Sequence, residues 1–83
     1  MIEVYGREGC SYCTKARELL DERDISYEYI QLGVDVTKEE FVQKFPGQKT
    51  VPVIVAYGMK VGGYSELVDY IEETSGGYGE NFK

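Results

Sequence analysis

The sequence predicts an α/β domain, with a mixed four-stranded sheet, helices on both faces and the element order β-α-β-α-β-β-α. Three observations carry this prediction. Short β-rich runs alternate with segments of helical periodicity through residues 1–74. A capping box, in which Thr37 is followed three residues later by Glu40, marks the start of one helix. A tight turn at Tyr57-Gly58 joins two short apolar runs as a hairpin.

The first half of the chain is expected to form a βαβ unit. Residues 2–5 contain β-branched residues that favour a strand, and residues 26–32 form a second such run. Between them, residues 14–24 have helical periodicity, with an apolar stripe of Cys13, Ala16, Leu19 and Leu20. A crossover connection of this kind makes the two strands parallel.

The second half begins with a loop at 33–36 and the helix that Thr37 caps, which Pro46-Gly47 ends. Residues 50–57 are the most apolar run and predict a central strand, followed by a short strand at 60–62. Ser65 is expected to cap a third helix. We expect one domain over residues 1–74 and a flexible, glycine-rich tail over residues 75–83.

Composition limits the classes of function. The formal net charge is -6, from 15 acidic and 9 basic residues, and no basic stripe suggests a nucleic-acid partner. No apolar run approaches the roughly 18 residues that span a membrane, and no signal-peptide pattern is seen. Both cysteines lie in one Cys-x-x-Cys, which indicates a transient disulfide in a reducing compartment, the cytoplasm.

The pair Cys10 and Cys13 lies where the first strand meets the first helix, which is typical of a thiol redox site. If Cys10 is the helix N-cap, Cys13 lies one turn further on and the two can form a disulfide. The helix N-terminus and Arg7 favour the thiolate form of Cys10. We therefore expect Cys10 to be the attacking thiol and Cys13, which should be less exposed, the resolving thiol.

Three other readings of the pair stay open at this point. A structural disulfide would close a loop too short to gain much chain entropy. A structural zinc site needs about four nitrogen or sulfur ligands, and the chain has two Cys and no His, so no metal is expected. Two unrelated buried thiols are the third reading, but this reading does not explain the glycine before the pair or the helix after it.

Three motifs together resemble the glutaredoxins, which have a thioredoxin-like fold. They are Cys10-Ser11-Tyr12-Cys13, Thr50-Val51-Pro52, and Gly62-Gly63 before the third helix. The resemblance covers residues 1–74 and is to the small dithiol glutaredoxins of bacteria and phages. It implies a cis peptide bond before Pro52, which turns the Val51 backbone groups toward the cysteines to pair with a substrate.

The resemblance also implies a glutathione site. Arg7, with Gln48 or Lys49, would meet the glycine carboxylate, and Tyr12 would flank the sulfur. The γ-glutamyl carboxylate would lie at the N–H groups that begin the third helix. The implied glutathione contacts are Arg7, Tyr12, Gln48, Lys49, Thr50, Val51, Pro52, Gly63, Tyr64 and Ser65. For Arg7 and Lys49 the alternative is a solvated surface charge, and Tyr5, Tyr27, Tyr29, Tyr57 and Tyr70 are expected in the core or the sheet.

Two residues depart from the family pattern. Ser11 stands where the family often has Pro, and Ser65 stands where it usually has Asp, the counter-charge to the γ-glutamyl ammonium.

The function expected from this resemblance is a monomeric, glutathione-dependent thiol–disulfide oxidoreductase that reduces protein disulfides and glutathione mixed disulfides. The resemblance implies ribonucleotide reductase as a client protein, although no residue of this sequence identifies a particular client. Two alternatives remain: a dimer that holds a glutathione-ligated [2Fe–2S] cluster, and an electron donor that thioredoxin reductase reduces without glutathione.

Overall fold

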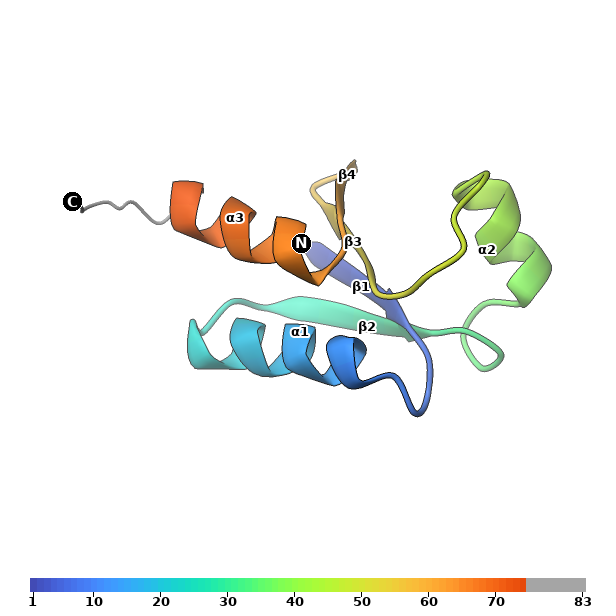
Figure 1. Cartoon of the computed structure of the whole chain (residues 1–83), viewed down its shortest axis with the longest axis horizontal. Coiled ribbons are helices and arrows are strands. Elements are labelled where there is room, and N and C mark those ends of the chain that lie inside the picture. The colour runs from blue at the N-terminus through green and yellow to red at the C-terminus, as the bar shows by residue number, and fades with distance from the viewer. Residues whose placement is uncertain (75–83) are drawn as a thin grey trace.

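The predicted element order is confirmed in the computed structural model, which describes residues 1–74 of the chain (Figure 1). The elements are β1 (Ile2–Gly6), α1 (Ser11–Glu22), β2 (Tyr27–Gln31), α2 (Lys38–Lys44), β3 (Val53–Ala56), β4 (Met59–Gly62) and α3 (Tyr64–Thr74). The tail expected at residues 75–83 lies outside the described residues.

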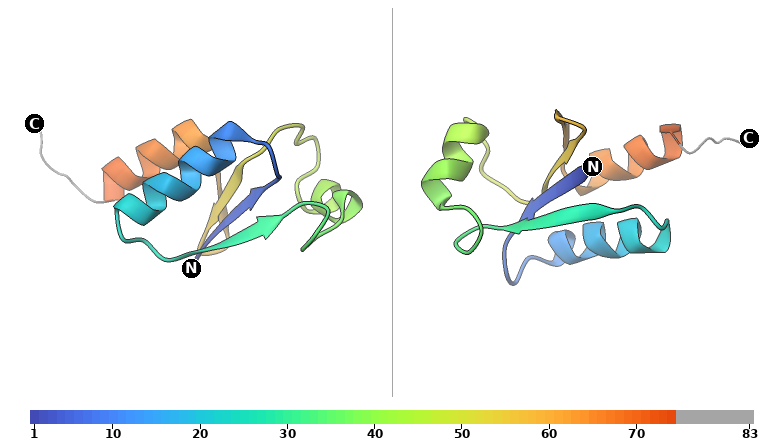
Figure 2. Two further views of the ribbon diagram at one scale, coloured as in Figure 1. Left: turned by 90° about the horizontal axis from the view of Figure 1, so that it is seen from below. Right: turned by 180° about the vertical axis from the view of Figure 1, so that it is seen from behind.

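The four strands form one mixed sheet in the order β2-β1-β3-β4. β1 runs parallel to β2 and antiparallel to β3, and β3 runs antiparallel to β4. Helices α1 and α3 lie side by side on one face of the sheet (Figures 1 and 2). Helix α2 packs on the other face through Phe41 and lies toward one end of the sheet. The thioredoxin-like α/β fold predicted from the sequence is therefore present.

The sheet separates two hydrophobic cores, because successive side chains of a strand point to opposite faces. In β3, Ile54 and Ala56 pack under α1 and α3, whereas Val53 and Val55 pack under α2. All four residues of β3 are buried, as expected for a strand covered on both faces. The larger core contains Ile2, Val4, Ala16, Leu20, Ile54, Ala56, Leu67 and Ile71, and the smaller one Tyr5, Phe41, Phe45, Val53 and Val55.

The local signals for α2 and for the hairpin hold. The Thr37 hydroxyl accepts from the Glu40 N–H at 3.0 Å, and the Glu40 carboxylate accepts from the Thr37 N–H at 2.8 Å. The hairpin turn places Tyr57 at φ 53° and Gly58 at φ 86°, the positive values that a two-residue type I′ turn requires. The placement of Tyr57 in core or sheet was wrong, because this turn leaves its side chain 72% exposed.

The expectation that Ser65 caps α3 was also wrong. The helix begins at Tyr64, and the Gly63 carbonyl accepts the Leu67 N–H at 3.0 Å, so Gly63 is at the cap position. Glycine has no side chain to cap with. The Glu66 carboxylate serves instead by accepting the Gly63 N–H at 2.8 Å, one half of a capping box. Ser65 lies exposed in the first turn.

Element bounds differ from expectation at the third strand. Residues 50–52 lead into β3 rather than belonging to it, and the peptide bond between Val51 and Pro52 is cis. Within residues 1–74, no helix has the length and apolar character needed to cross a bilayer.

Candidate functional site

Cys10 and Cys13 form a disulfide at the start of α1, with their Cα atoms 5.2 Å apart. Cys10 is the N-cap of the helix, and its Sγ accepts the Cys13 N–H at 3.1 Å. This places one of the four unpaired amide groups of a helix N-terminus on the Cys10 sulfur. Negative charge on that sulfur is favoured by the amide and by the helix dipole.

The two sulfurs differ in access to solvent. Cys13 is 1% exposed and lies in the first turn, facing the core, whereas Cys10 is half-buried. Gly9, at φ 80° with no atom near its missing side chain, turns the chain into the helix at this point. An incoming disulfide can therefore reach Cys10 but not Cys13.

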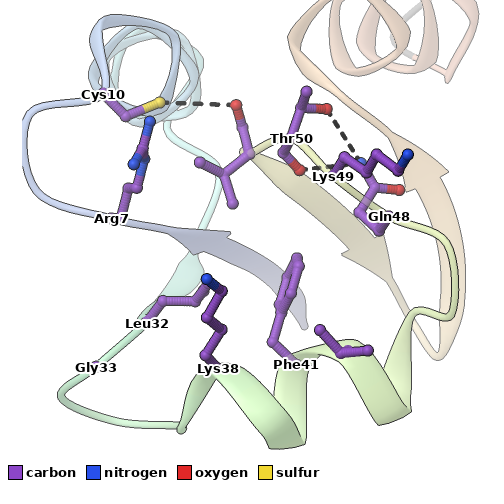
Figure 3. Close-up of a pocket in the computed structure, with 11 residues that line it drawn as sticks. Arg7, Cys10, Leu32, Gly33, Lys38, Phe41, Gln48, Lys49 and Thr50 are labelled. Carbon is purple, nitrogen blue, oxygen red and sulfur yellow. Dashed lines mark hydrogen bonds between the residues drawn. The ribbon is translucent and has the colours of Figure 1, made fainter.

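The loop before β3 passes in front of Cys10. The Cys10 Sγ lies 3.7 Å from the Val51 carbonyl oxygen, and the next residue, Pro52, is buried. Figure 3 shows Cys10, at the start of α1, across one opening from the loop that carries Thr50. Val51 belongs to no strand, and its carbonyl oxygen is next to the Cys10 sulfur.

A pocket of about 730 Å³ extends from Cys10 toward α2 (Figure 3). Three cationic side chains line it, Arg7 after β1, Lys38 at the start of α2 and Lys49 in the loop, and no carboxylate of residues 1–74 does. In a chain of net charge -6, this is a local concentration of positive charge suited to an anion. The full lining is Arg7, Cys10, Leu32, Gly33, Lys38, Phe41, Val42, Gln48, Lys49, Thr50 and Val51.

The residues expected to bind glutathione divide into two groups. Arg7, Gln48, Lys49, Thr50 and Val51 line the pocket with Cys10, but Tyr12, Pro52, Gly63, Tyr64 and Ser65 do not.

The second group lies where α1 meets α3. The Tyr12 and Tyr64 rings are 5.8 Å apart, and Tyr12 is 55% exposed. A β-carbon on Gly63 would lie 3.7 Å from the Pro52 carbonyl oxygen, so the start of α3 is close to the loop.

The Gln48 side chain is already hydrogen-bonded to other residues of the protein. Its side-chain amide donates to the Thr50 carbonyl oxygen at 2.9 Å and to the Thr50 hydroxyl at 3.2 Å, and its Oε1 accepts from Lys60 Nζ at 2.8 Å. The side chain therefore holds the loop before Val51 in place, and its donors are occupied in this structure.

The N-terminus of α3 carries a carboxylate of its own. The Gly63 N–H donates to Glu66, and this hydrogen bond lowers the pKa of the Glu66 carboxyl below its ordinary value. A negative charge therefore lies next to Ser65, where the sequence has no Asp.

Sequence reasoning missed the α2 side of the pocket. Lys38, Phe41 and Val42 fall within the helix that Thr37 caps, and no sequence pattern marks them as residues of a site. Their approach to Cys10 comes from the packing of α2 against the sheet, which no local signal records. Over residues 1–74, no group of three or more His, Cys, Asp or Glu residues is arranged to hold a metal ion.

Comparison with known proteins gives consistent matches. A family model described as the glutathione S-transferase N-terminal domain matches residues 4–79. Glutaredoxin 1 of Rickettsia conorii is 43% identical over 74 residues, which cover 87% of this chain and 72% of the relative. The solution structure of reduced Escherichia coli glutaredoxin has a TM-score of 0.74 at 30% identity, covering 89% of this chain and 95% of that chain. A buckwheat glutaredoxin–glutathione complex has a TM-score of 0.70 at 22% identity, covering 88% and 69%.

Proposed function

The chain belongs to the glutaredoxin family of thiol–disulfide oxidoreductases, and on that premise we propose that it uses glutathione to reduce protein disulfides and glutathione mixed disulfides. In this proposal Cys10 is the attacking thiol, Cys13 the resolving thiol and glutathione the reductant. The observation that supports it best is the contrast between the two sulfurs, one at the helix N-cap and half-buried, the other 1% exposed.

The catalytic cycle has two exchanges. The Cys10 thiolate attacks one sulfur of a client disulfide, forms a mixed disulfide and releases the other client sulfur as a thiolate. Cys13 then loses its proton and attacks the Cys10 sulfur, which closes the Cys10–Cys13 disulfide and releases the second client thiol. Two glutathione molecules reduce that disulfide and become oxidised glutathione. A substrate that is already a glutathione mixed disulfide needs Cys10 alone.

Glutathione as the reductant is supported by charge and by the loop geometry. Arg7, Lys38 and Lys49 offer positive charge beside Cys10 for the glycine carboxylate. The Val51 backbone near the Cys10 sulfur can pair with the cysteinyl backbone of glutathione. One structural neighbour of similar fold was solved as a glutathione complex. At the start of α3, Glu66 offers the counter-charge to the γ-glutamyl ammonium that Ser65 lacks.

The compartment and the oligomeric state that we propose follow from the redox chemistry of the two cysteines and from the position of the site. A disulfide that opens and closes in each cycle fits a reducing compartment such as the cytoplasm. The site described here lies within one chain, so we propose a monomer that acts on disulfide-bonded client proteins.

Two variants test the assignment of the thiols. We expect Cys10→Ser to abolish all disulfide exchange. Cys13→Ser should keep the reduction of small glutathione mixed disulfides and lose most reduction of a protein disulfide such as insulin. Equal losses in both assays from both variants would contradict the division of labour.

A coupled assay tests the reductant. The oxidised protein is offered either glutathione with glutathione reductase and NADPH, or thioredoxin reductase with NADPH, and NADPH consumption is followed. We expect turnover with glutathione. Turnover with thioredoxin reductase alone would refute glutathione dependence while leaving the roles of the two thiols intact.

A further inference from the structure

The buried sulfur of Cys13 shares a small space with a tyrosine hydroxyl. A β-carbon placed on Gly6, at the end of β1, would lie 2.6 Å from the Tyr29 hydroxyl oxygen and 2.9 Å from the Cys13 sulfur. Gly6 has ordinary strand geometry, so glycine serves here for space and not for a special backbone angle. The missing side chain lets the hydroxyl on β2 and the sulfur on α1 both approach the same point of β1.

The Tyr29 hydroxyl has a weak partner in the oxidised protein. It donates to the Arg7 carbonyl oxygen at 3.5 Å, the outer limit of a hydrogen bond. Since Cys13 is 1% exposed, little solvent reaches its sulfur to stabilise a charge there.

A cation lies on the Tyr29 ring. The Arg17 guanidinium is 4.3 Å from the ring centroid, a cation–π contact. The pKa of Arg17 is raised, first by its hydrogen bond with Tyr27 and then by its charge interactions with Tyr27 and Tyr29. Positive charge against the ring draws electron density from the phenol and makes its O–H a stronger donor.

We propose that Tyr29 is a positioning residue for the resolving step, in which its hydroxyl donates a hydrogen bond to the Cys13 sulfur and stabilises the thiolate. Among the described residues, the titratable groups beside this sulfur are Cys10, the N-cap of α1, and Tyr29 on β2. Arg17 lies over the Tyr29 ring, and Arg7 meets the Tyr29 hydroxyl through its backbone carbonyl. Cys10 is a mixed disulfide at this stage and has no proton to donate, so of the two groups beside the sulfur the Tyr29 hydroxyl is the donor.

The step balances without a further reactant. The Cys13 S–H bond breaks, its proton passes to solvent or to the departing client thiolate, and the Cys13 sulfur attacks the Cys10 sulfur. The Cys10–client S–S bond breaks as the Cys10–Cys13 S–S bond forms, and the client sulfur takes the electron pair. Tyr29 keeps its own proton throughout. The inference rests on the proposed role of Cys13 as the resolving thiol.

The size of the effect follows from two opposing terms. A hydrogen bond to a charged group shifts the thiol–thiolate equilibrium by about ten- to hundredfold. A more stable thiolate is also a weaker nucleophile, with a Brønsted slope of about 0.4–0.5. Losing the hydroxyl should therefore slow the resolving step about three- to tenfold at a pH where Cys13 is mostly protonated, and less at high pH.

The aromatic disulfide 5,5′-dithiobis(2-nitrobenzoate) separates the two steps in one stopped-flow trace. Attack by Cys10 releases a first coloured thiolate in a phase that depends on reagent concentration. Attack by Cys13 on the mixed disulfide releases a second one in a phase that does not. The variant is Tyr29→Phe, which removes only the hydroxyl. Its matched control is Tyr27→Phe, on the same strand and also in contact with Arg17.

We expect Tyr29→Phe to slow the second phase about three- to tenfold near neutral pH and to move the midpoint of its pH profile upward by about 1–2 units. The first phase should stay within about twofold. Tyr27→Phe should leave the midpoint of the second phase unchanged. Arg17→Gln, a change at the surface, should move the midpoint in the same direction as Tyr29→Phe but by less.

An unchanged midpoint in Tyr29→Phe would overturn the proposal, and so would an equal shift in Tyr27→Phe, because a purely structural role of the hydroxyl moves no titration. Failure of the underlying function has a different signature. If the reduced wild-type protein shows no second, concentration-independent phase, or if Cys13→Ser keeps one, then Cys13 is not the resolving thiol.

Discussion

Gly6→Ala tests the close approach of three elements behind the active site. The new methyl group would lie 2.6 Å from the Tyr29 oxygen and 2.9 Å from the Cys13 sulfur, so these atoms must move. Overpacking of this kind costs about 1–3 kcal/mol. Alanine recovers about 0.5–1 kcal/mol of the entropy that glycine loses in a strand. The net loss should be about 1 kcal/mol, which lowers the melting temperature of a domain this small by roughly 4–8 °C.

Thermal unfolding of the oxidised protein, followed by circular dichroism, measures this loss. Tyr29→Phe removes one of the two crowded atoms, so the double variant should lose less than the sum of the single losses. Gly33→Ala is the control: it strains a residue at φ 84° with no atom within 4 Å, and its cost should add to that of Tyr29→Phe. A Gly6→Ala protein that melts at or above the parent temperature would refute the crowding.

Three further expectations concern charged side chains near the active site. The hydrogen bond from the Gly63 N–H lowers the pKa of Glu66 in the folded protein. The ionised Glu66 carboxylate therefore stabilises the fold fully above 4.5, its pKa in the unfolded chain, and this stabilisation is lost as the pH falls through the pKa in the folded state. The stability gap between wild type and Glu66→Gln should therefore narrow in urea titrations between about pH 7 and pH 3, and a constant gap would contradict the capping role. Ser65→Asp adds a second carboxylate beside Glu66, and calorimetry with S-methyl glutathione should show less than about sixfold tighter binding at low salt, the effect of an exposed ion pair. Lys38→Gln should weaken the same binding by up to about fivefold at low salt, with Arg23→Gln, at the far end of α1 and outside the pocket, as the unchanged control.

Local chemistry made much of the fold predictable. Thr37 and Glu40 are three residues apart, and both halves of their capping box are present. The spacing of the cysteines placed Cys10 at a helix N-cap in the same way. Each of these signals is complete within one helical turn, so no distant contact was needed to interpret it.

The errors arose where two local solutions were possible or where the cause was distant. Ser65 is a good cap by type, but Gly63 with Glu66 provides an equivalent cap two residues earlier, and the sequence contains both. The contribution of Lys38 to the pocket depends on how α2 packs against the sheet. The meeting of Tyr29 with Cys13 depends on the pairing of β2 with β1 and on the absence of a side chain at Gly6. Such information lies in the assembly of elements rather than in any one of them.

The larger hydrophobic core holds two helices, α1 and α3, to the sheet, whereas the smaller core holds only α2. Helix α2 has seven residues, too few to be stable alone in water, and it is held to the sheet chiefly by Phe41 and Phe45. It should therefore open locally before α1 or α3, so that its amide hydrogens exchange with deuterium faster. Helix α2 also forms one wall of the pocket beside Cys10. We therefore expect the width of that pocket to change while α1, which carries the cysteines, stays folded. Under the proposed function, we expect this to let client disulfides in loops of different bulk reach the same sulfur.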